Sequence, residues 1–179
     1  MLNLLYLKDE LIMDHNIKII QDVDFALSVM RSASKWMSIN GKIVSNWWKL
    51  ENLNKNFLLQ YAKEEEFYVG LIDNNLVVAA ILQTSQNAQD WKNIDKDKSK
   101  TALYVHWLCI YHRFSGNNLP KVMIDFAEQL AKDKNINLLR CDTNAEELKL
   151  REIYEQLGFK LIDIEQEDYR QTAFYEKEI

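Results

Sequence analysis

Ala-Leu-Tyr-Val-His-Trp-Leu-Cys-Ile at residues 102–110, Tyr-His-Arg-Phe-Ser-Gly-Asn-Asn at 111–118 and Leu-Pro-Lys-Val-Met-Ile-Asp-Phe-Ala-Glu-Gln-Leu-Ala at 119–131 decide the fold. The first segment is almost wholly apolar and rich in aromatic and β-branched residues, which is typical of a buried strand. The second is a short, mostly polar turn, and the third repeats its apolar residues at helical spacing. A strand that passes through such a turn into a helix gathers free backbone N–H groups at the positive end of the helix dipole. This arrangement indicates an anion site.

The same stretch resembles the central motif of the GNAT superfamily of N-acetyltransferases. In that family a strand ending in Leu-x-Val leads to Arg/Gln-Gly-x-Gly-x-Gly/Ala and a long helix. Here Leu108-Cys109-Ile110 stands for Leu-x-Val, and Ser-Gly-Asn-Asn-Leu-Pro at 115–120 falls on the glycine-rich segment. Farther along, Ile-Tyr-Glu-Gln-Leu-Gly-Phe at 153–159 matches the family signature Leu-Tyr-Glu-Lys-Leu-Gly-Phe almost letter for letter. The resemblance covers about residues 66–164.

The resemblance implies an α/β protein with the GNAT (acyl-CoA N-acyltransferase) fold, in which a central mixed sheet of six or seven strands has helices on both faces. We expect a single domain over residues 1–179, with residues 1–12 as a non-essential extension. The implied activity is transfer of an acetyl group from acetyl-CoA to a primary amine by direct attack in a ternary complex. A small cationic amine is favoured over a protein amino group. The alternative is a catalytically degenerate GNAT-fold protein that serves as an acyl-CoA-binding or regulatory module.

The family's cofactor contacts can be carried over onto the central stretch. By this resemblance the strand backbone at Leu108, Cys109 and Ile110 polarises the thioester. The pyrophosphate would be held by the turn and the first helical residues, which are Ser115, Gly116, Asn117, Asn118, Leu119 and Lys121.

The turn departs from the family pattern in three ways. Gly116 is its only glycine, Ser115 replaces Arg or Gln, and Pro120, which has no N–H, replaces the last Gly or Ala. These losses keep the degenerate alternative open. His112 and Arg113 are further candidates for phosphate contacts; otherwise they are solvated loop residues.

Tyr154 is the candidate general acid. It occupies the position of the second signature from which the family protonates the coenzyme thiolate. A phenol remains protonated at neutral pH and can donate its proton as charge develops on sulfur. The alternative interpretation is a core tyrosine on the buried face of a helix.

His106 is the candidate general base. Alternation along the strand places it on one face with Tyr104 and Leu108, and an imidazole can take a proton from an amine near neutral pH. A lone histidine on a strand can also be a satisfied core residue. In that case the base would be a carboxylate such as Asp142 or Glu147, or a bound water.

Composition narrows the partners. A hydrophobic content of 47% with four glycines and one proline argues against disorder, and the net charge of −5 disfavours nucleic acid as a partner. The N-terminal apolar run is too short for a signal peptide, and no stretch approaches the ~18 apolar residues of a membrane span. We therefore expect a cytoplasmic protein with a small-molecule amine as acceptor and no membrane partner; a homodimer is left open. Cys109 and Cys141 show no metal-ligand spacing, so no metal is expected.

The flanking segments predict further elements. Asp22 or Asp24 can cap a helix, and two strands between residues 66 and 82 read as a hairpin turning at Asp73-Asn74-Asn75. A helix is expected from about 145 to 157, burying Leu150, Ile153, Tyr154 and Leu157, with Gly158 as its stop signal.

Two tryptophan features remain. Trp47 and Trp48 are adjacent in a helical region, so they point about 100° apart; one would pack in the core and the other at an edge or against the acceptor. Trp91 lies in the polar segment 83–101 and is expected to anchor that loop rather than contact a ligand. The acidic run 163–168 is either solvated or near the acceptor entrance.

Overall fold

The computed structural model describes residues 17–42, 45–85, 91, 94, 101–166 and 170–179. It contains a seven-stranded sheet with the order β1-β2-β3-β4-β5-β7-β6. Strands β4 and β5 are parallel, whereas β1–β2, β2–β3, β5–β7 and β6–β7 are antiparallel. The predicted mixed sheet is therefore confirmed with seven strands. The expected extension at residues 1–12 lies outside the described residues.

The chain divides into two compact units, one of residues 1–81 and 107–123 and the other of residues 82–106 and 124–179. That they act as the single domain expected from the sequence stays a prediction. The first unit holds β1 (Lys18–Gln21), α2 (Val23–Ile39), the short 3₁₀ turn η1 (Asn46–Trp48), α3 (Lys55–Leu58), η2 (Glu64–Glu66), β2 (Phe67–Ile72) and η3 (His112–Phe114). The second holds β5 (Leu138–Asn144), α5 (Leu148–Gln156), β6 (Lys160–Gln166) and β7 (Gln171–Glu178). Strands β3 (Asn75–Gln83) and β4 (Leu103–Ile110) and helix α4 (Leu119–Asp133) have residues in both.

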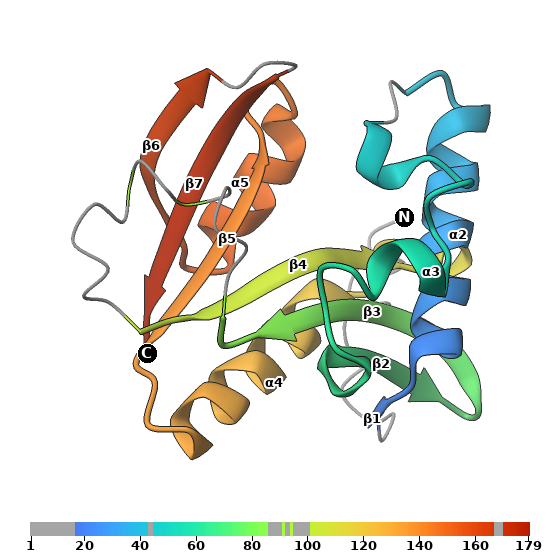
Figure 1. The fold of residues 1–179 in the computed structure, drawn as a ribbon, viewed down its shortest axis with the longest axis horizontal. Helices are drawn as coiled ribbons and strands as arrows, with labels where there is room; N and C mark the ends of the chain where they lie inside the picture. The colour runs from blue at the N-terminus through green and yellow to red at the C-terminus, as the bar shows by residue number, and fades with distance from the viewer. Residues whose placement is uncertain (1–16, 43–44, 86–90, 92–93, 95–100, 167–169) are drawn as a thin grey trace, which may run out of the picture. The chain divides into compact units, whose positions relative to one another are not determined.

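In the first unit, α2 packs on β2 through its apolar face (Figure 1). Asp22 caps this helix, because its Oδ1 accepts the N–H of Phe25 at 2.8 Å, as one of the two sequence alternatives predicts. The β2–β3 hairpin turns through Asp73 (φ 47°) and Asn74 (φ 61°). Two consecutive left-handed residues are what a tight two-residue hairpin turn requires, so the turn is one residue shorter than expected.

In the second unit, α5 lies against the strands β5, β7 and β6 (Figure 1). The helix begins at Leu148, three residues later than predicted, because the N–H of Ala145 still bonds the Gln171 carbonyl at 2.8 Å and prolongs the β5–β7 pairing. The expectation that Leu150 and Ile153 are buried is wrong: they are 37% and 40% exposed.

The C-terminal end of α5 follows the prediction. Gly158 has φ 88°, a left-handed conformation suited to glycine, and the N–H of Phe159 returns to the Tyr154 carbonyl at 3.0 Å. Tyr154 itself is buried.

Trp91 is the largest fully buried side chain of the described residues. Its ring meets Phe174 at 5.0 Å and Tyr104 at 5.9 Å, and the guanidinium of Arg140 lies 4.6 Å above it. Arg140 in turn bonds Glu176 through Nη2 at 2.6 Å. The burial of Trp91 agrees with the expected anchor, although most of the surrounding loop lies outside the described residues.

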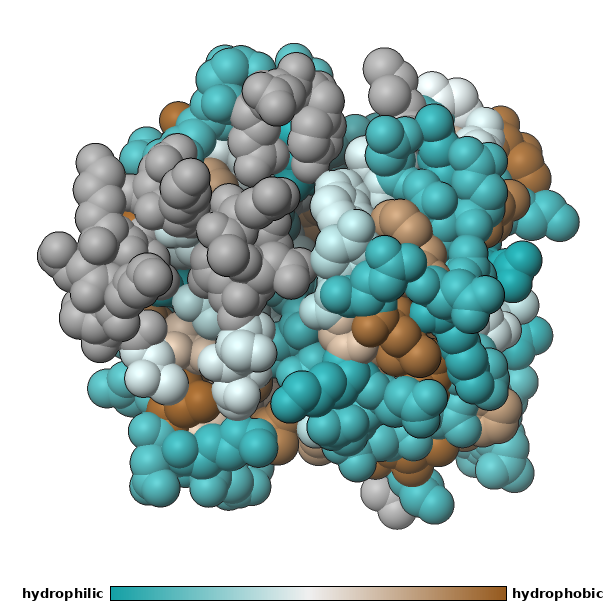
Figure 2. Space-filling model, viewed as in Figure 1, coloured by the Kyte–Doolittle hydropathy of each residue, from teal (hydrophilic) through white to brown (hydrophobic). Residues whose placement is uncertain are grey.

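The face of the molecule in Figure 2 is largely hydrophilic, with separate hydrophobic areas between the polar ones. Within the part of the chain that the structure describes, no helix is long and apolar enough to cross a membrane. The same part of the chain contains no group of three or more His, Cys, Asp or Glu residues placed to hold a metal ion.

Candidate active site

Trp107 in strand β4 has an unusual backbone conformation. This residue has φ 49°, a left-handed conformation that is a clear outlier for a bulky side chain within a strand. Such a residue breaks the alternation of side chains, as a β-bulge does. The prediction that His106 shares a face with Tyr104 is confirmed, because their rings stack with centroids 6.2 Å apart and planes 8° apart. Alternation no longer assigns Leu108 to that face, since Trp107 lies between.

The turn after β4 presents a row of backbone donors. Gly116 (φ 83°) and Asn118 (φ 49°) are left-handed, and α4 begins directly after them at Leu119. Within the described part of the chain, the N–H groups of Gly116, Asn117, Asn118 and Leu119 donate to no other residue. Four consecutive unbonded donors at the start of a 15-residue helix are suited to bind an anion, both by hydrogen bonding and through the helix dipole.

The other predicted donors in this segment are already engaged. The N–H and Oγ of Ser115 both bond the carbonyl of His112, at 3.0 and 2.7 Å, and the N–H of Lys121 bonds the Asn118 carbonyl at 3.1 Å. Pro120 occupies the second helical position, where its missing N–H removes no intrahelical bond. The donor set is thus narrower than the sequence suggests, and it lies N-terminal to the proline.

The two basic residues of the turn contact protein groups. The Arg113 guanidinium donates to Asn75 Oδ1 at 2.9 Å and lies over the rings of Tyr111 and Phe114. The His112 ring stacks on Trp36 of α2 at 4.6 Å. These contacts hold the turn against β3 and α2, so a role in positioning the backbone donors fits both residues better than a phosphate contact.

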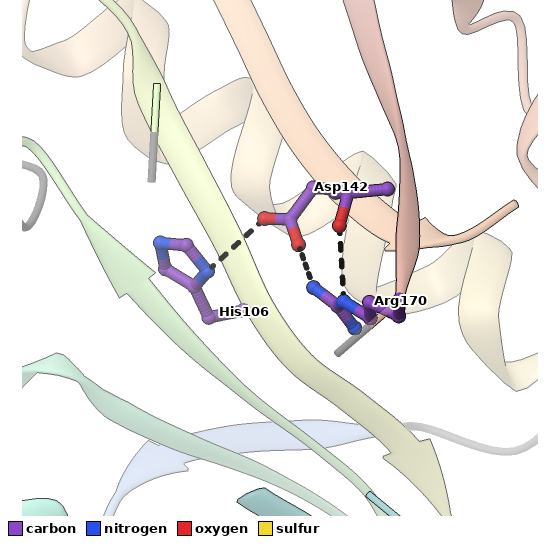
Figure 3. A network of polar contacts seen from close by, with 4 residues as sticks. His106, Asp142 and Arg170 are labelled. Atoms are coloured by element: carbon purple, nitrogen blue, oxygen red, sulfur yellow. Dashed lines mark hydrogen bonds and ion pairs between the residues drawn. The ribbon is translucent and has the colours of Figure 1, made fainter. Parts of the chain in front are cut away.

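Figure 3 shows a polar network around His106 in the second unit. The parallel register pairs Tyr104 with Arg140, and two residues farther along each strand His106 and Asp142 face one another. Nδ1 of His106 lies 3.9 Å from Oδ1 of Asp142, while Oδ2 of Asp142 accepts from Nη2 of Arg170 at 3.0 Å. All three side chains are mostly buried, with exposed fractions of 12%, 16% and 21%.

A further contact of this network joins Arg170 to β7: its Nε donates to Oγ1 of Thr172 at 3.0 Å. The carboxylate of Asp142 is therefore fixed by a cation on one side and turned to the imidazole on the other. Sequence analysis missed Arg170, because nothing in its sequence neighbourhood indicates that it reaches a strand 28 residues earlier.

Tyr154 lies on the inner face of α5. Its ring contacts Phe159 at 5.7 Å and Tyr175 at 5.9 Å, and the residue is 5% exposed. The hydroxyl of Tyr175 accepts from Arg151 at 2.9 Å and lies 3.3 Å from Glu155. Burial raises the pKa of the Tyr175 phenol, which therefore stays protonated at neutral pH.

Both cysteines are buried and unpaired by a disulfide. Burial raises the pKa of the Cys109 thiol and that of the Cys141 thiol. A thiolate, not a thiol, is the nucleophile of cysteine enzymes. Neither residue is therefore suited to carry an acyl group at neutral pH, and Cys109 can serve the site only through its backbone.

A cluster of aromatic rings that includes Trp107 lies within the first unit. The ring of Trp47 has its centroid 4.9 Å from that of Tyr61 and 5.8 Å from those of Phe57 and Trp107. Trp48, in contrast, packs against the main hydrophobic core. The prediction that the two tryptophans divide between the core and another site is confirmed, but the sequence did not single out Trp107.

We compared the chain with known proteins. The family described as the acetyltransferase (GNAT) domain matches residues 42–173, whereas no curated protein matches the chain. Among solved structures, an acetyltransferase of the GNAT family from Listeria monocytogenes is 20% identical with a TM-score of 0.70, covering 91% of this chain and 95% of its own.

Two further structures were solved with a coenzyme. The PaiA N-acetyltransferase of Thermoplasma acidophilum, in complex with coenzyme A, is 19% identical with a TM-score of 0.66 over 92% of this chain and 99% of its own. A GNAT-family acetyltransferase of Elizabethkingia anophelis with acetyl-CoA bound is 14% identical with a TM-score of 0.55 over 70% and 84%. At these identities the structures show a shared fold. The family match spans well over half of the sequence, and the chain belongs to the GNAT acetyltransferase family.

Proposed function

We propose that the protein is an acetyl-CoA-dependent N-acetyltransferase that modifies a small primary amine. The observation that carries this proposal is the row of unbonded N–H groups from Gly116 to Leu119 at the start of α4. A pyrophosphate matches such a row in charge and in its number of acceptor oxygens. The coenzymes in the Thermoplasma and Elizabethkingia structures support the same choice of ligand.

The backbone of two consecutive segments would bind the cofactor. The turn holds the pyrophosphate, and the strand residues Leu108, Cys109 and Ile110 that follow Trp107 offer their backbone groups to the pantetheine arm and the thioester carbonyl. When bound, acetyl-CoA supplies the acetyl group, so that an N–C bond to the amine forms as the thioester C–S bond breaks. Neither cysteine of this chain is suited to carry the acetyl group, which supports the proposal that the amine attacks directly in a ternary complex.

His106 is proposed to remove the proton of the amine. It immediately precedes Trp107 in β4, and its Nδ1 is on the Asp142 side of the ring, so Nε2 is the nitrogen that we assign to the proton. Asp142 stabilises the imidazolium that results, and Arg170 keeps Asp142 in place. Tyr154 is proposed to donate its Oη proton to the coenzyme sulfur, because it matches the family signature and α5 holds it in a fixed, buried position.

Calorimetric titration of the full chain with acetyl-CoA tests the cofactor assignment. We expect micromolar binding, and binding weaker by at least 100-fold for S-acetylpantetheine, which has the thioester and the pantetheine arm but no pyrophosphate. Equal affinities for the two ligands would show that the turn does not hold the pyrophosphate. No binding at millimolar acetyl-CoA would remove the proposed activity altogether.

The base assignment is tested by chemical rescue. His106→Gly should keep the affinity for acetyl-CoA but lower the turnover number by at least 100-fold, since a positioned base contributes about 10²–10⁴. Added imidazole should restore part of the rate. His112→Gly is the matched control, because its ring stacks on Trp36 outside the network, and imidazole should leave its rate unchanged. Failure of imidazole to raise the His106→Gly rate would argue for a structural histidine.

The degenerate alternative is favoured by one observation, the loss of the family's glycines and of a donor at Pro120. The same titration, combined with an assay of thiol release in the presence of amines, separates the enzyme from the degenerate alternative. A protein that binds acetyl-CoA tightly yet releases no thiol with any amine would be a binding or regulatory module, not an enzyme.

A further inference from the structure

We infer that the acceptor is an arylalkylamine, a primary amine on a short chain that ends in an aromatic ring, and that it packs against the aromatic cluster of Trp47, Phe57, Tyr61 and Trp107. This inference rests on the proposed function and narrows its substrate class. The four side chains come from three separate segments, namely η1, the region of α3 and strand β4. All four residues are partly buried, and Phe57 and Trp107 also pack against the main hydrophobic core, so the cluster extends from the core to the surface.

The geometry of the cluster gives a ligand flat apolar walls. Trp47 meets Tyr61 edge to face at 79° and Trp107 at 77°, while Phe57 lies tilted against Trp47 and Tyr61 at 57°. Edge-to-face packing leaves ring faces directed outward from each contact, and aromatic rings prefer offset or edge contacts with another aromatic ring. A further ring can therefore join the cluster in the way its own members do.

Trp47 contacts the rings of this cluster, whereas its neighbour Trp48 packs against the main hydrophobic core. Trp47 lies in the 3₁₀ turn η1, in which successive side chains point about 120° apart. The next residue, Trp48, takes the core side, and its carbonyl is held by the hydroxyl of Ser34 at 2.5 Å. The backbone of η1 is thus anchored through Trp48, and Trp47 is displayed on a different side of the turn.

Trp107 links the cluster to the strand residues that are proposed to hold the thioester, which lie in the same unit. Its left-handed backbone is strained for a bulky residue, and strain of this kind is concentrated at functional sites. The next residue in the chain is Leu108, the first of the three residues proposed to hold the thioester. Because consecutive Cα atoms are only about 3.8 Å apart, Trp107 lies beside this thioester segment. An amine that reaches this segment therefore has its substituent next to the ring of Trp107.

The chemistry of the cluster selects among amines. Once His106 has removed its proton, the reacting nitrogen carries no charge, so a cation–π contact does not hold it during the attack. Recognition by these rings therefore falls on the body of the molecule. The four members supply aromatic surface but no carboxylate to pair the additional ammonium groups of a polyamine. A peptide amino group would bring backbone amides, which lose solvation against such rings. An aromatic body gains the most from these contacts.

The experiment measures thiol release by the full chain at fixed acetyl-CoA with three acceptors: 2-phenylethylamine, spermidine and a short peptide with a free N-terminus. We expect kcat/KM to be at least tenfold higher for 2-phenylethylamine than for the other two. Trp47→Leu and Phe57→Leu should each lower kcat/KM for 2-phenylethylamine by about tenfold, mainly through KM, and leave acetyl-CoA affinity unchanged. Phe25→Leu is the matched control, since Phe25 is 42% exposed on α2 and contributes no ring to the cluster; it should change neither value.

The outcomes separate this inference from the proposed function. Equal or faster acetylation of spermidine or of the peptide would overturn the arylalkylamine class while leaving the acetyltransferase in place. A preference for 2-phenylethylamine that both cluster variants retain would overturn the cluster as its binding surface. If one variant fails to fold, as judged by its Tm, the other decides. Binding of acetyl-CoA without thiol release for any of the three amines would also overturn the inference, and absence of acetyl-CoA binding would remove the proposed function beneath it.

Discussion

Gly116→Ala separates backbone strain from cofactor binding. Gly116 has φ 83°, and a Cβ at this position would meet nothing within 4 Å. The substitution therefore costs the left-handed penalty of about 1–2 kcal/mol and no steric clash within the protein. For a chain of 179 residues this lowers Tm by about 2–8 °C. The fold itself should survive.

Cofactor affinity should fall much further than stability alone explains. A shift in φ at residue 116 relieves only part of the strain. It also rotates the adjacent peptide planes and turns the N–H groups of Gly116 and Asn117 away from the directions they have in the native turn. Each hydrogen bond to a charged phosphate contributes about 1.5–3 kcal/mol. Loss of one such bond weakens acetyl-CoA binding by about 10- to 150-fold.

Gly41→Ala is the control. Gly41 lies in the same unit and also has a left-handed φ, 69°, and a Cβ at this position would likewise meet nothing within 4 Å. It should lower Tm to a similar extent and leave the affinity unchanged. Thermal unfolding and calorimetric titration of both variants measure the two effects. If Gly116→Ala binds acetyl-CoA within threefold of the wild type, the row of donors at α4 is not the pyrophosphate site.

Three further outcomes are expected. Tyr154→Phe should keep the affinity for acetyl-CoA and slow turnover by about 10- to 1,000-fold, whereas an unchanged turnover number, with chemistry limiting, would reduce Tyr154 to a packing role. Glu176→Gln removes the carboxylate that pairs with the guanidinium of Arg140, which is 1% exposed. We expect the free energy of unfolding to fall by about 3 kcal/mol and Tm to fall by about 6–12 °C. Asp24→Asn, at the exposed pair with Lys55, should shift Tm far less, and equal shifts would contradict the argument. Because burial raises the pKa of both cysteine thiols, they stay protonated as the pH rises through 9, so iodoacetamide should label them at least 100-fold more slowly in the folded than in the unfolded protein.

Local sequence patterns determined the elements of the central stretch. Each element of this stretch is predicted by its own residues. The β-branched and aromatic run predicts a strand, the polar residues predict a turn, and the helical repeat of apolar residues predicts a helix. The structure places β4 and α4 at these positions. Gly158 alone likewise predicts the end of a helix, since only a residue without Cβ adopts a φ of 88° without strain. The family resemblance rests on the same local patterns.

The start of α5 shows where such patterns fail. Ala145, Glu146 and Glu147 read as helix formers, but Ala145 pairs with Gln171, which is 26 residues away in the chain. A hydrogen bond to a distant strand outweighs the weak intrinsic preference of three residues. The exposure of Leu150 and Ile153 follows from the same tertiary setting of the helix.

The site depended on tertiary structure most of all. The sequence predicted phosphate donors between Ser115 and Lys121. Only the folded turn shows that the N–H of Ser115 is hydrogen-bonded to the His112 carbonyl, whereas the N–H groups of Gly116 to Leu119 donate to no other described residue. In the same way, the strand pattern was enough to propose His106 as the base, but it did not show which side chains surround the imidazole in the fold. Asp142 reaches it through the register of two parallel strands, and Arg170 joins from a third strand region. Register between distant segments is set by the packing of the whole sheet, and no spacing within the sequence records it.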